Sequence, residues 1–166
     1  MVKKIVGTGV LLVLALALQA GVKMYTLKSP DGKVKLEVTA GQGIAYSLFY
    51  DGRLLLKPSR IALHTDLPEA DHWETVQAPF YRVKEFGIDC NELELRLNNG
   101  FSLLMRAYND GMAYRFVAGR KGEMTVVEER AEFNFADDFE AYIPYSTNPK
   151  DPWNMAFQNF YTKASL

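Results

Sequence analysis

The sequence predicts an all-β fold, an antiparallel β-sandwich, on three grounds. Apolar and polar residues alternate with a period of two in most runs after Gly21, as in Val34–Val38 and Glu92–Leu97. Asp-Gly and Asn-Gly turns separate such runs, for example Asp51-Gly52 and Asn99-Gly100. Beyond the N-terminal segment, no window of about a dozen residues has the apolar spacing of an amphipathic helix.

Composition excludes several classes of protein. The 166 residues are 48% hydrophobic and 23% charged, as expected for one globular domain or part of a larger one. The formal net charge of −1 provides no positive field for nucleic acid, so we expect no nucleic-acid partner. Cys90 is the single cysteine, so the chain cannot form an intrachain disulfide, and with two histidines it cannot complete a standard zinc site.

Residues 1–20 have the anatomy of a secretory signal peptide. Lys3-Lys4 forms a positive n-region, Ile5–Leu18 is apolar, and Ala15-Leu16-Ala17 offers the small residues that a signal peptidase recognises. The alternative is an uncleaved anchor, but about 14 apolar residues are short for a span that needs about 20. We therefore expect a periplasmic or secreted domain over residues 21–166, without stable membrane association after signal cleavage.

Turn residues bound the predicted strands in chain order. The first strand ends at Ser29-Pro30-Asp31-Gly32, where Pro presets φ and Gly accepts a positive φ. The segment Asp66–Pro79 contains two prolines and Trp73 among acidic residues, and we expect a long loop or sheet-crossing connection there. The predicted strands are Val22–Lys28, Val34–Val38, Ile44–Tyr50, Arg53–Leu56, Glu92–Leu97, Phe101–Tyr108, Met112–Val117, Met124–Val127, Glu132–Phe135 and Ala141–Ile143.

Aromatic residues make up 13% of the chain and fall into two groups. Trp153 and Tyr161 lie outside the predicted strands, and because exposed aromatic rings stack on sugars, they are the candidate substrate-binding residues. The chain also ends in apolar and aromatic residues instead of a polar tail, so we expect a domain that is interrupted at this point. The remaining aromatic residues are predicted to be core or cross-strand pairs: Tyr46, Phe49, Phe101, Tyr114, Phe116, Phe133 and Phe135.

Adjacent carboxylates are the first candidates for catalysis in an exported protein. Glu128-Glu129 and Asp137-Asp138 are such pairs. Neighbouring side chains of a strand point to opposite faces, so we expect solvated edges or turns and no converging acid–base pair. Asp137, Asp138 and Glu140 also lack the Asp-x-Asp-x-Asp-Gly spacing that is specific for a calcium loop.

The histidines and the cysteine give no stronger signal. Nothing in the sequence fixes the geometry of His64 relative to His72, and we expect an ordinary loop there. Cys90 lies between Asp89 and Asn91 with no fixed base nearby, which predicts a buried or half-buried structural thiol. We therefore predict no catalytic residue in this chain.

An ordered series of segments resembles the N-terminal domain of glycoside hydrolase family 97, the exported bacterial α-glucosidases and α-galactosidases. The most specific segment is Arg106-Ala107-Tyr108-Asn109-Asp110-Gly111-Met112-Ala113-Tyr114-Arg115-Phe116. It follows Ser29-Pro30-Asp31-Gly32-Lys33, Tyr50-Asp51-Gly52-Arg53 with Lys57-Pro58-Ser59, and Asn91-Glu92-Leu93-Glu94-Leu95. The resemblance runs from about Val22 to the C-terminus.

This resemblance implies an incomplete mutarotase-like β-super-sandwich that precedes a (β/α)8 barrel carrying the catalytic carboxylates. The domain would pack beside the mouth of the barrel, and its late segments would help to shape the substrate pocket. The family also implies a calcium ion held mainly by glutamates. The matching position in Phe157–Thr162 holds Gln158, which offers calcium a carbonyl oxygen without charge and is the candidate metal ligand.

The resemblance also implies a function. We expect the N-terminal domain of an α-glycosidase that hydrolyses terminal α-linked glucose or galactose, with the missing barrel and an oligosaccharide as partners. This chain alone would be inactive. The alternative is a stand-alone, non-catalytic carbohydrate-binding β-sandwich. A mutarotase-like isomerase would need a converging acid–base pair, for which only His64 and His72 are available as histidines.

Overall fold

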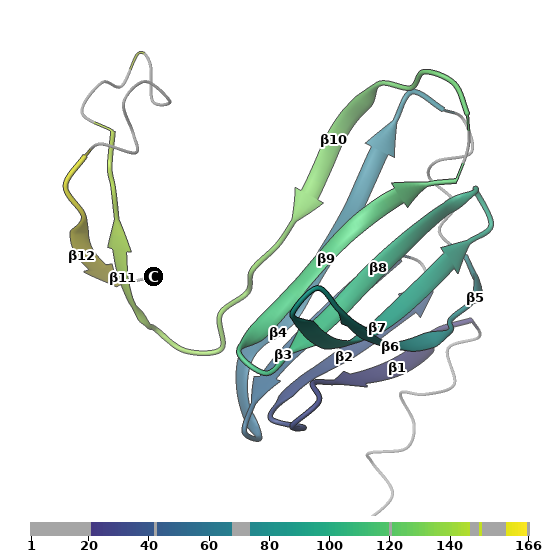
Figure 1. Ribbon diagram of the computed structural model, residues 1–166. Helices are drawn as coiled ribbons and strands as arrows, with labels where there is room; N and C mark the ends of the chain where they lie inside the picture. Colours follow the sequence, from purple (N-terminus) through teal and green to yellow (C-terminus); the bar gives the residue numbers. More distant parts are fainter. Residues whose placement is uncertain are drawn as a thin grey trace, which may run out of the picture.

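Every regular element in the described part of the chain is a β-strand. The computed structural model describes residues 21–41, 43–67, 74–119, 121–146, 150 and 159–165. Their strands form two five-stranded antiparallel sheets and one two-stranded sheet (Figure 1). The predicted all-β, antiparallel fold is therefore confirmed. The described residues contain no helix that is long and apolar enough to cross a membrane.

The first sheet follows the chain through four strands and then takes up a distant fifth. β1 to β4 pair in sequence, and β10 returns antiparallel to β4. Asp51 and Gly52 form the two-residue turn between β3 and β4 with φ values of 48° and 80°, as expected for an Asp-Gly hairpin. The strands are β1 (Lys23–Lys28), β2 (Val34–Gly41), β3 (Gly43–Tyr50), β4 (Arg53–Thr65) and β10 (Val126–Ala131).

The second sheet has β7 in its centre. The short β5 and β6 both pair with β7, which pairs in turn with β8, and β9 is the last strand. The strands are β5 (Thr75–Gln77), β6 (Phe80–Glu85), β7 (Ile88–Leu97), β8 (Phe101–Tyr108) and β9 (Gly111–Ala118). Their alternating apolar residues point toward the first sheet, which completes a two-layer sandwich.

The core lies between the two sheets. β2 and β8 both show the alternating buried pattern that their sequences predict. Each fully buried leucine stabilises the fold by about 1.5–3 kcal/mol relative to an exposed one. The core residues are Leu27, Val34, Leu36, Val38, Ala40, Ile44, Tyr46, Leu56 and Ile61 of the first sheet, and Leu93, Leu95, Leu97, Phe101, Leu103, Met105 and Ala107 of the second.

Side chains join the sheets along one edge of the sandwich. Lys23 Nζ of β1 donates a hydrogen bond to the Thr75 carbonyl oxygen of β5 at 2.8 Å. At the other end of β1, Asn91 Nδ2 donates to the Lys28 carbonyl oxygen at 2.7 Å. At the opposite edge, β9 and β10 are the last strands of their sheets.

The third sheet stands apart from the sandwich. β11 (Glu140–Ile143) and β12 (Thr162–Ser165) pair antiparallel and form an arm that projects beyond β9 and β10 (Figure 1). Lys163 Nζ forms an ion pair with Glu140 Oε1 at 2.5 Å across this arm. Residues 132–139 connect the arm to β10.

Several strand boundaries differ from the prediction. β4 continues past the predicted end at Leu56 to Thr65, because its pairing with β3 and β10 overrides the charged and polar residues in between. β5 occupies part of the expected loop Asp66–Pro79, and β6 and β12 lie where no strand was predicted. β10 spans Val126–Ala131 and overlaps the predicted strand Met124–Val127 only at its end. The predicted strand Glu132–Phe135 follows β10 and makes only an isolated bridge, between Phe135 and Leu56.

Candidate functional site

The segment after β10 is fixed along β4 by backbone hydrogen bonds. The amide of Glu132 donates to the Arg60 carbonyl at 3.0 Å, and that of Ala136 donates to the Leu55 carbonyl at 2.9 Å. Between them, the Lys57 amide donates to the Asn134 carbonyl at 2.8 Å. These bonds position residues 132–136 as a strand-like border of the first sheet.

A buried hydroxyl fixes this border further. Ser59 is fully buried, and its Oγ accepts a hydrogen bond from the Asn134 amide at 2.9 Å while donating to the Lys57 carbonyl at 2.9 Å. Asn134 Nδ2 also donates to the Pro58 carbonyl at 2.8 Å. The backbone of this segment is therefore held in place while its neighbouring aromatic side chains point outward.

Tyr46 links the border to the core. Its side chain is buried, and its hydroxyl donates to the Glu132 carbonyl at 3.3 Å. Burial, and secondarily the nearby Tyr114, raises the pKa of Tyr46 to about 12, so the hydroxyl remains a donor at neutral pH. The Tyr46 and Tyr114 rings lie 6.3 Å apart. Burial likewise raises the pKa of Tyr114, with a smaller contribution from Glu129.

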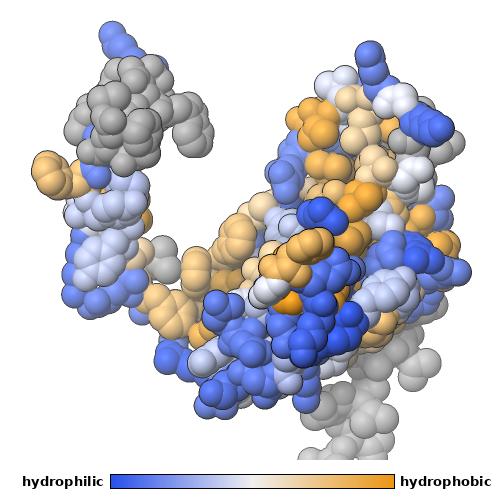
Figure 2. Space-filling view, viewed as in Figure 1, coloured by the Kyte–Doolittle hydropathy of each residue, from blue (hydrophilic) through white to orange (hydrophobic). Residues whose placement is uncertain are grey.

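Exposed apolar side chains lie at the start of β10, on this border and on the arm. We call them the C-terminal surface: Val126, Val127, Phe133, Phe135, Tyr142, Tyr145, Phe160 and Tyr161, each at least 43% exposed. Figure 2 shows apolar atoms along the hollow between the arm and the sandwich. All six residues of β10 are exposed, which is unusual for a strand with an apolar sequence at its start.

Phe133 and Phe135, predicted to be core residues or cross-strand pairs, are not in the core, although Phe135 forms an antiparallel bridge with Leu56. They are 53% and 43% exposed, because no described element packs over the outer border of the first sheet. Phe135 contacts Phe139 edge-to-face, with ring centroids 6.0 Å apart. Arg53 lies over the Phe139 ring at 5.5 Å and forms an ion pair with Asp137 at 3.3 Å.

Phe133, Phe135 and Asp137 help to line an open hollow of about 650 Å³. Its lining residues are Lys57, Phe133, Asn134, Phe135, Ala136, Asp137 and Asp138. Aromatic rings with a cation and two carboxylates beside them form a surface with an apolar centre and a polar rim. The sequence signal for this group was the alternation Phe133-Asn134-Phe135, which predicts a strand but does not say whether its apolar face is covered.

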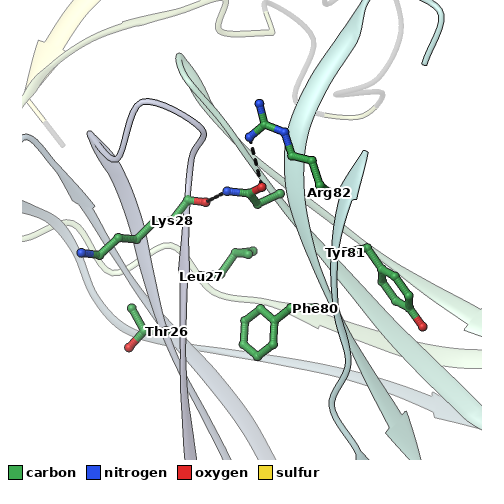
Figure 3. A pocket seen from close by; sticks show the side chains of 7 residues that line it. Thr26, Leu27, Lys28, Phe80, Tyr81 and Arg82 are labelled. Atoms are coloured by element: carbon green, nitrogen blue, oxygen red, sulfur yellow. Dashed lines mark hydrogen bonds between the residues drawn. The ribbon is translucent and has the colours of Figure 1, made fainter. Parts of the chain in front are cut away.

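A second groove lies at the joined edge of the sandwich, between β1 and β6. It has a volume of about 480 Å³, and Figure 3 shows Phe80 facing Leu27 across it, whereas the Tyr81 ring points to the other side of β6. Asn91 spans the groove, because it donates to the Lys28 carbonyl and accepts a hydrogen bond from Arg82 Nη1 at 3.2 Å. These polar groups already satisfy one another.

The structure describes only some of the residues that the sequence predicts to form a site. Trp153 and Gln158 lie outside the described residues, and so does His72. Tyr161 is 65% exposed and belongs to the C-terminal surface. His64 lies on β4 instead of in the expected loop.

The titratable candidates form no converging site in the described ranges. Glu128 and Glu129 are exposed neighbours on β10, in line with the predicted solvated strand edge or turn. Cys90 is buried, as predicted for this thiol. Within the same described ranges, no group of three or more His, Cys, Asp or Glu side chains could hold a metal ion. The calcium ion that the resemblance implies stays a prediction.

Known proteins match both the sequence and the fold. The family described as glycosyl-hydrolase 97 N-terminal matches residues 27–166. A Bacteroides thetaiotaomicron protein named retaining alpha-galactosidase is 36% identical over 171 residues, which cover 91% of this chain and 25% of that protein. The chain thus spans about a quarter of the length of this curated relative.

Solved structures share the fold at low sequence identity. A β-arabinopyranosidase matches with a TM-score of 0.68 and 18% identity, over 83% of this chain and 26% of the other. A glycoside hydrolase family 97 enzyme from a Pseudoalteromonas species, in complex with panose, matches with a TM-score of 0.59 and 14% identity, over 74% and 22%. From the family match over most of its length, the chain belongs to the glycosyl-hydrolase 97 N-terminal family.

Proposed function

We propose that this chain is the N-terminal β-sandwich domain of an exported α-glycosidase that hydrolyses terminal α-linked galactose or glucose. The observation that carries the proposal is the 36% identity to a retaining α-galactosidase of which this chain covers a quarter. The catalytic carboxylates would lie in the remaining three quarters, in the barrel. If the parent enzyme retains configuration as that relative's name indicates, two carboxyl groups about 5–5.5 Å apart are needed there.

We assign the C-terminal surface to contact with that barrel. Its eight apolar side chains are exposed in this chain, and such an exposed apolar patch is typical of a protein contact. The core of such an interface is apolar and its rim is polar. The Phe133, Phe135 and Phe139 rings would form the apolar core, and the ion pair of Arg53 with Asp137 would belong to the polar rim. The domain would contact the barrel through β10 and the arm. It would also contribute part of the wall of the substrate pocket, where Tyr161 is a candidate substrate-binding residue.

The test begins with the nucleotide sequence downstream of Leu166. An open frame that continues into (β/α) repeats, with hydrolysis of p-nitrophenyl α-galactoside or α-glucoside by the full-length product, supports the proposal. Residues 21–166 alone should hydrolyse neither substrate. A stop codon directly after Leu166 overturns it. Calorimetric titration with oligosaccharides would then test the alternative, a stand-alone carbohydrate-binding sandwich.

A further inference from the structure

The turn between β6 and β7 carries a fully exposed aromatic ring on an unfavourable backbone. Glu85 pairs with Ile88, so Phe86 and Gly87 are the two central residues of the turn. Their φ values are 48° and 78°, and the Phe86 side chain is 99% exposed. A bulky residue at a left-handed φ is uncommon, and such strain clusters at functional positions.

The chain itself provides the comparison. The β3–β4 turn has nearly the same pair of φ values, 48° and 80°, with Asp51 and Gly52 at the equivalent positions. Asp and Asn are favoured in this turn because their short polar side chains tolerate the left-handed region. An aspartate would therefore suit this turn better than Phe86, whose apolar ring is exposed to water.

The hairpin holds this ring on a rigid support. Arg82 and Asp89 form an ion pair at 2.5 Å across the two strands. Arg82 also donates to Asn91, which in turn donates to the Lys28 carbonyl of the opposite sheet. A side chain presented by a pre-organised backbone loses little conformational entropy when it binds.

The surroundings of the ring indicate what it contacts. Lys84 and Glu85 beside it are exposed and opposite in charge, and Ile88 is 37% exposed. This balanced charge favours neither an anionic nor a cationic partner, and an apolar pocket with a polar rim fits the turn best. One ring is far smaller than the roughly 1,600 Å² of a stable interface between separate proteins, but it suffices within one polypeptide, where the effective concentration is high.

We propose that the β6–β7 turn is a second docking point, in which Phe86 inserts into an apolar pocket on the part of the parent enzyme outside this chain. This inference rests on the proposed function. The chain covers 25% of its curated relative, so most of such a parent would lie beyond these residues. The contact would be separate from the C-terminal surface.

Hydrogen exchange followed by mass spectrometry tests the proposal. The full-length parent and the isolated residues 21–166 are compared as wild type, as Phe86→Asn, and as the control Val76→Thr at an exposed position on β5. In the wild-type parent, amides 84–88 should exchange at least about tenfold more slowly than in the isolated domain. Phe86→Asn should abolish this difference, and Val76→Thr should preserve it.

The outcomes separate the two proposals. If β10 and the arm are protected in the parent but the turn exchanges equally in both proteins, the docking role of Phe86 is overturned and the proposed domain contact stands. If none of these segments gains protection, the proposed function fails as well. If the isolated domain dimerises in sedimentation and Phe86→Asn abolishes the dimer, the turn is a self-association contact and the proposal is wrong.

Discussion

Glu92 and Arg106 form an ion pair that is largely shielded from water. The Arg106 Nε donates to Glu92 Oε2 at 2.5 Å, and the two side chains are 28% and 10% exposed. The pair joins neighbouring positions on β7 and β8. The hydrogen bond to Glu92 raises the pKa of Arg106, so the guanidinium stays charged at any ordinary pH. Both strands belong to the second sheet, and we expect the pair to contribute to its stability.

Replacing Arg106 with methionine should lower the free energy of unfolding by about 1–3 kcal/mol, because it leaves the shielded Glu92 carboxylate without its partner. Urea unfolding of residues 21–166 at pH 7 measures this loss. Arg53→Met is the control, since Arg53 and Asp137 are 65% and 68% exposed and should contribute less than about 1 kcal/mol. Equal losses in the two variants would contradict the argument.

Glu94 is a single residue that makes the stability of the fold depend on pH. Its carboxylate accepts hydrogen bonds from Arg96 at 3.0 Å, Ser102 at 3.1 Å and Tyr81 at 3.3 Å. Arg96 makes the largest contribution to a lowered pKa of Glu94. A carboxyl group with a lowered folded-state pKa stabilises the fold above its unfolded pKa, and this stability is lost as the pH falls through the folded value.

Replacing Glu94 with glutamine should therefore flatten the acid side of the stability profile. The wild-type domain should lose more of its unfolding free energy between pH 7 and about pH 3 than the variant does. Urea midpoints at the two pH values measure the difference. The exposed Glu128→Gln variant is the control and should follow the wild type, whereas identical slopes for wild type and Glu94→Gln would refute the assignment.

At the scale of elements, the arm and the sandwich differ in how they are stabilised. β11 and β12 bond to each other, and an isolated pair of strands is marginally stable in water. Tyr142 on β11 is 62% exposed, and Phe160 just before β12 is 97% exposed. The arm thus provides exposed apolar area without a core of its own, which suits a segment that becomes stable on docking.

Ending the chain at Phe139 should leave the stability of the sandwich nearly unchanged. The truncated protein keeps the ring contact of Phe135 with Phe139 and the hydrogen bonds along β4. Its free energy of unfolding, measured with urea, should match that of residues 21–166 to within about 0.5 kcal/mol. A substantially lower midpoint would show that the arm packs on the sandwich.

The sequence predicts the elements best where one strand face is buried. The alternation in β2 and β8 predicts both the strands and their core residues. β6 was missed because Phe80-Tyr81-Arg82 does not alternate in polarity, although its pairing with β7 makes it a strand. The exposure of Phe133 and Phe135 could not be predicted, since it depends on what lies over the first sheet and not on their own neighbours.

At the scale of the whole molecule, the ordered motifs predict the family, whereas the sequence predicts only part of the candidate functional site. The Arg106–Phe116 block forms the end of β8, its turn and most of β9, so it identifies the family through a structural hairpin. Tyr161 is exposed on the C-terminal surface, and its role in substrate binding stays a prediction. Arg53 was missed, because a β4 residue contacts Phe139 only through the path of the chain after β10.

Replacing both Phe133 and Phe135 with serine should affect the parent enzyme far more than this domain. The two half-exposed rings should contribute no more than about 1 kcal/mol to the isolated domain, whereas Leu103→Ala in the core should cost about 2–5 kcal/mol. In the full-length enzyme, the double variant should inactivate at a lower temperature than the wild type. Unchanged thermal inactivation of hydrolysis would argue against a role of this surface in the contact.

Among the described residues, β9 and β10 are the outer strands of their sheets and are exposed while the protein is synthesised. A nascent chain emerges from its N-terminus, so this sandwich would be complete before a downstream barrel exists to cover it. During that interval the edge strand β10 could pair with the same strand of a neighbouring chain. Glu128, Glu129 and Arg130 place three charged side chains on β10, and charges on an edge oppose such pairing. These charges would thereby protect β10 against edge-to-edge aggregation during synthesis.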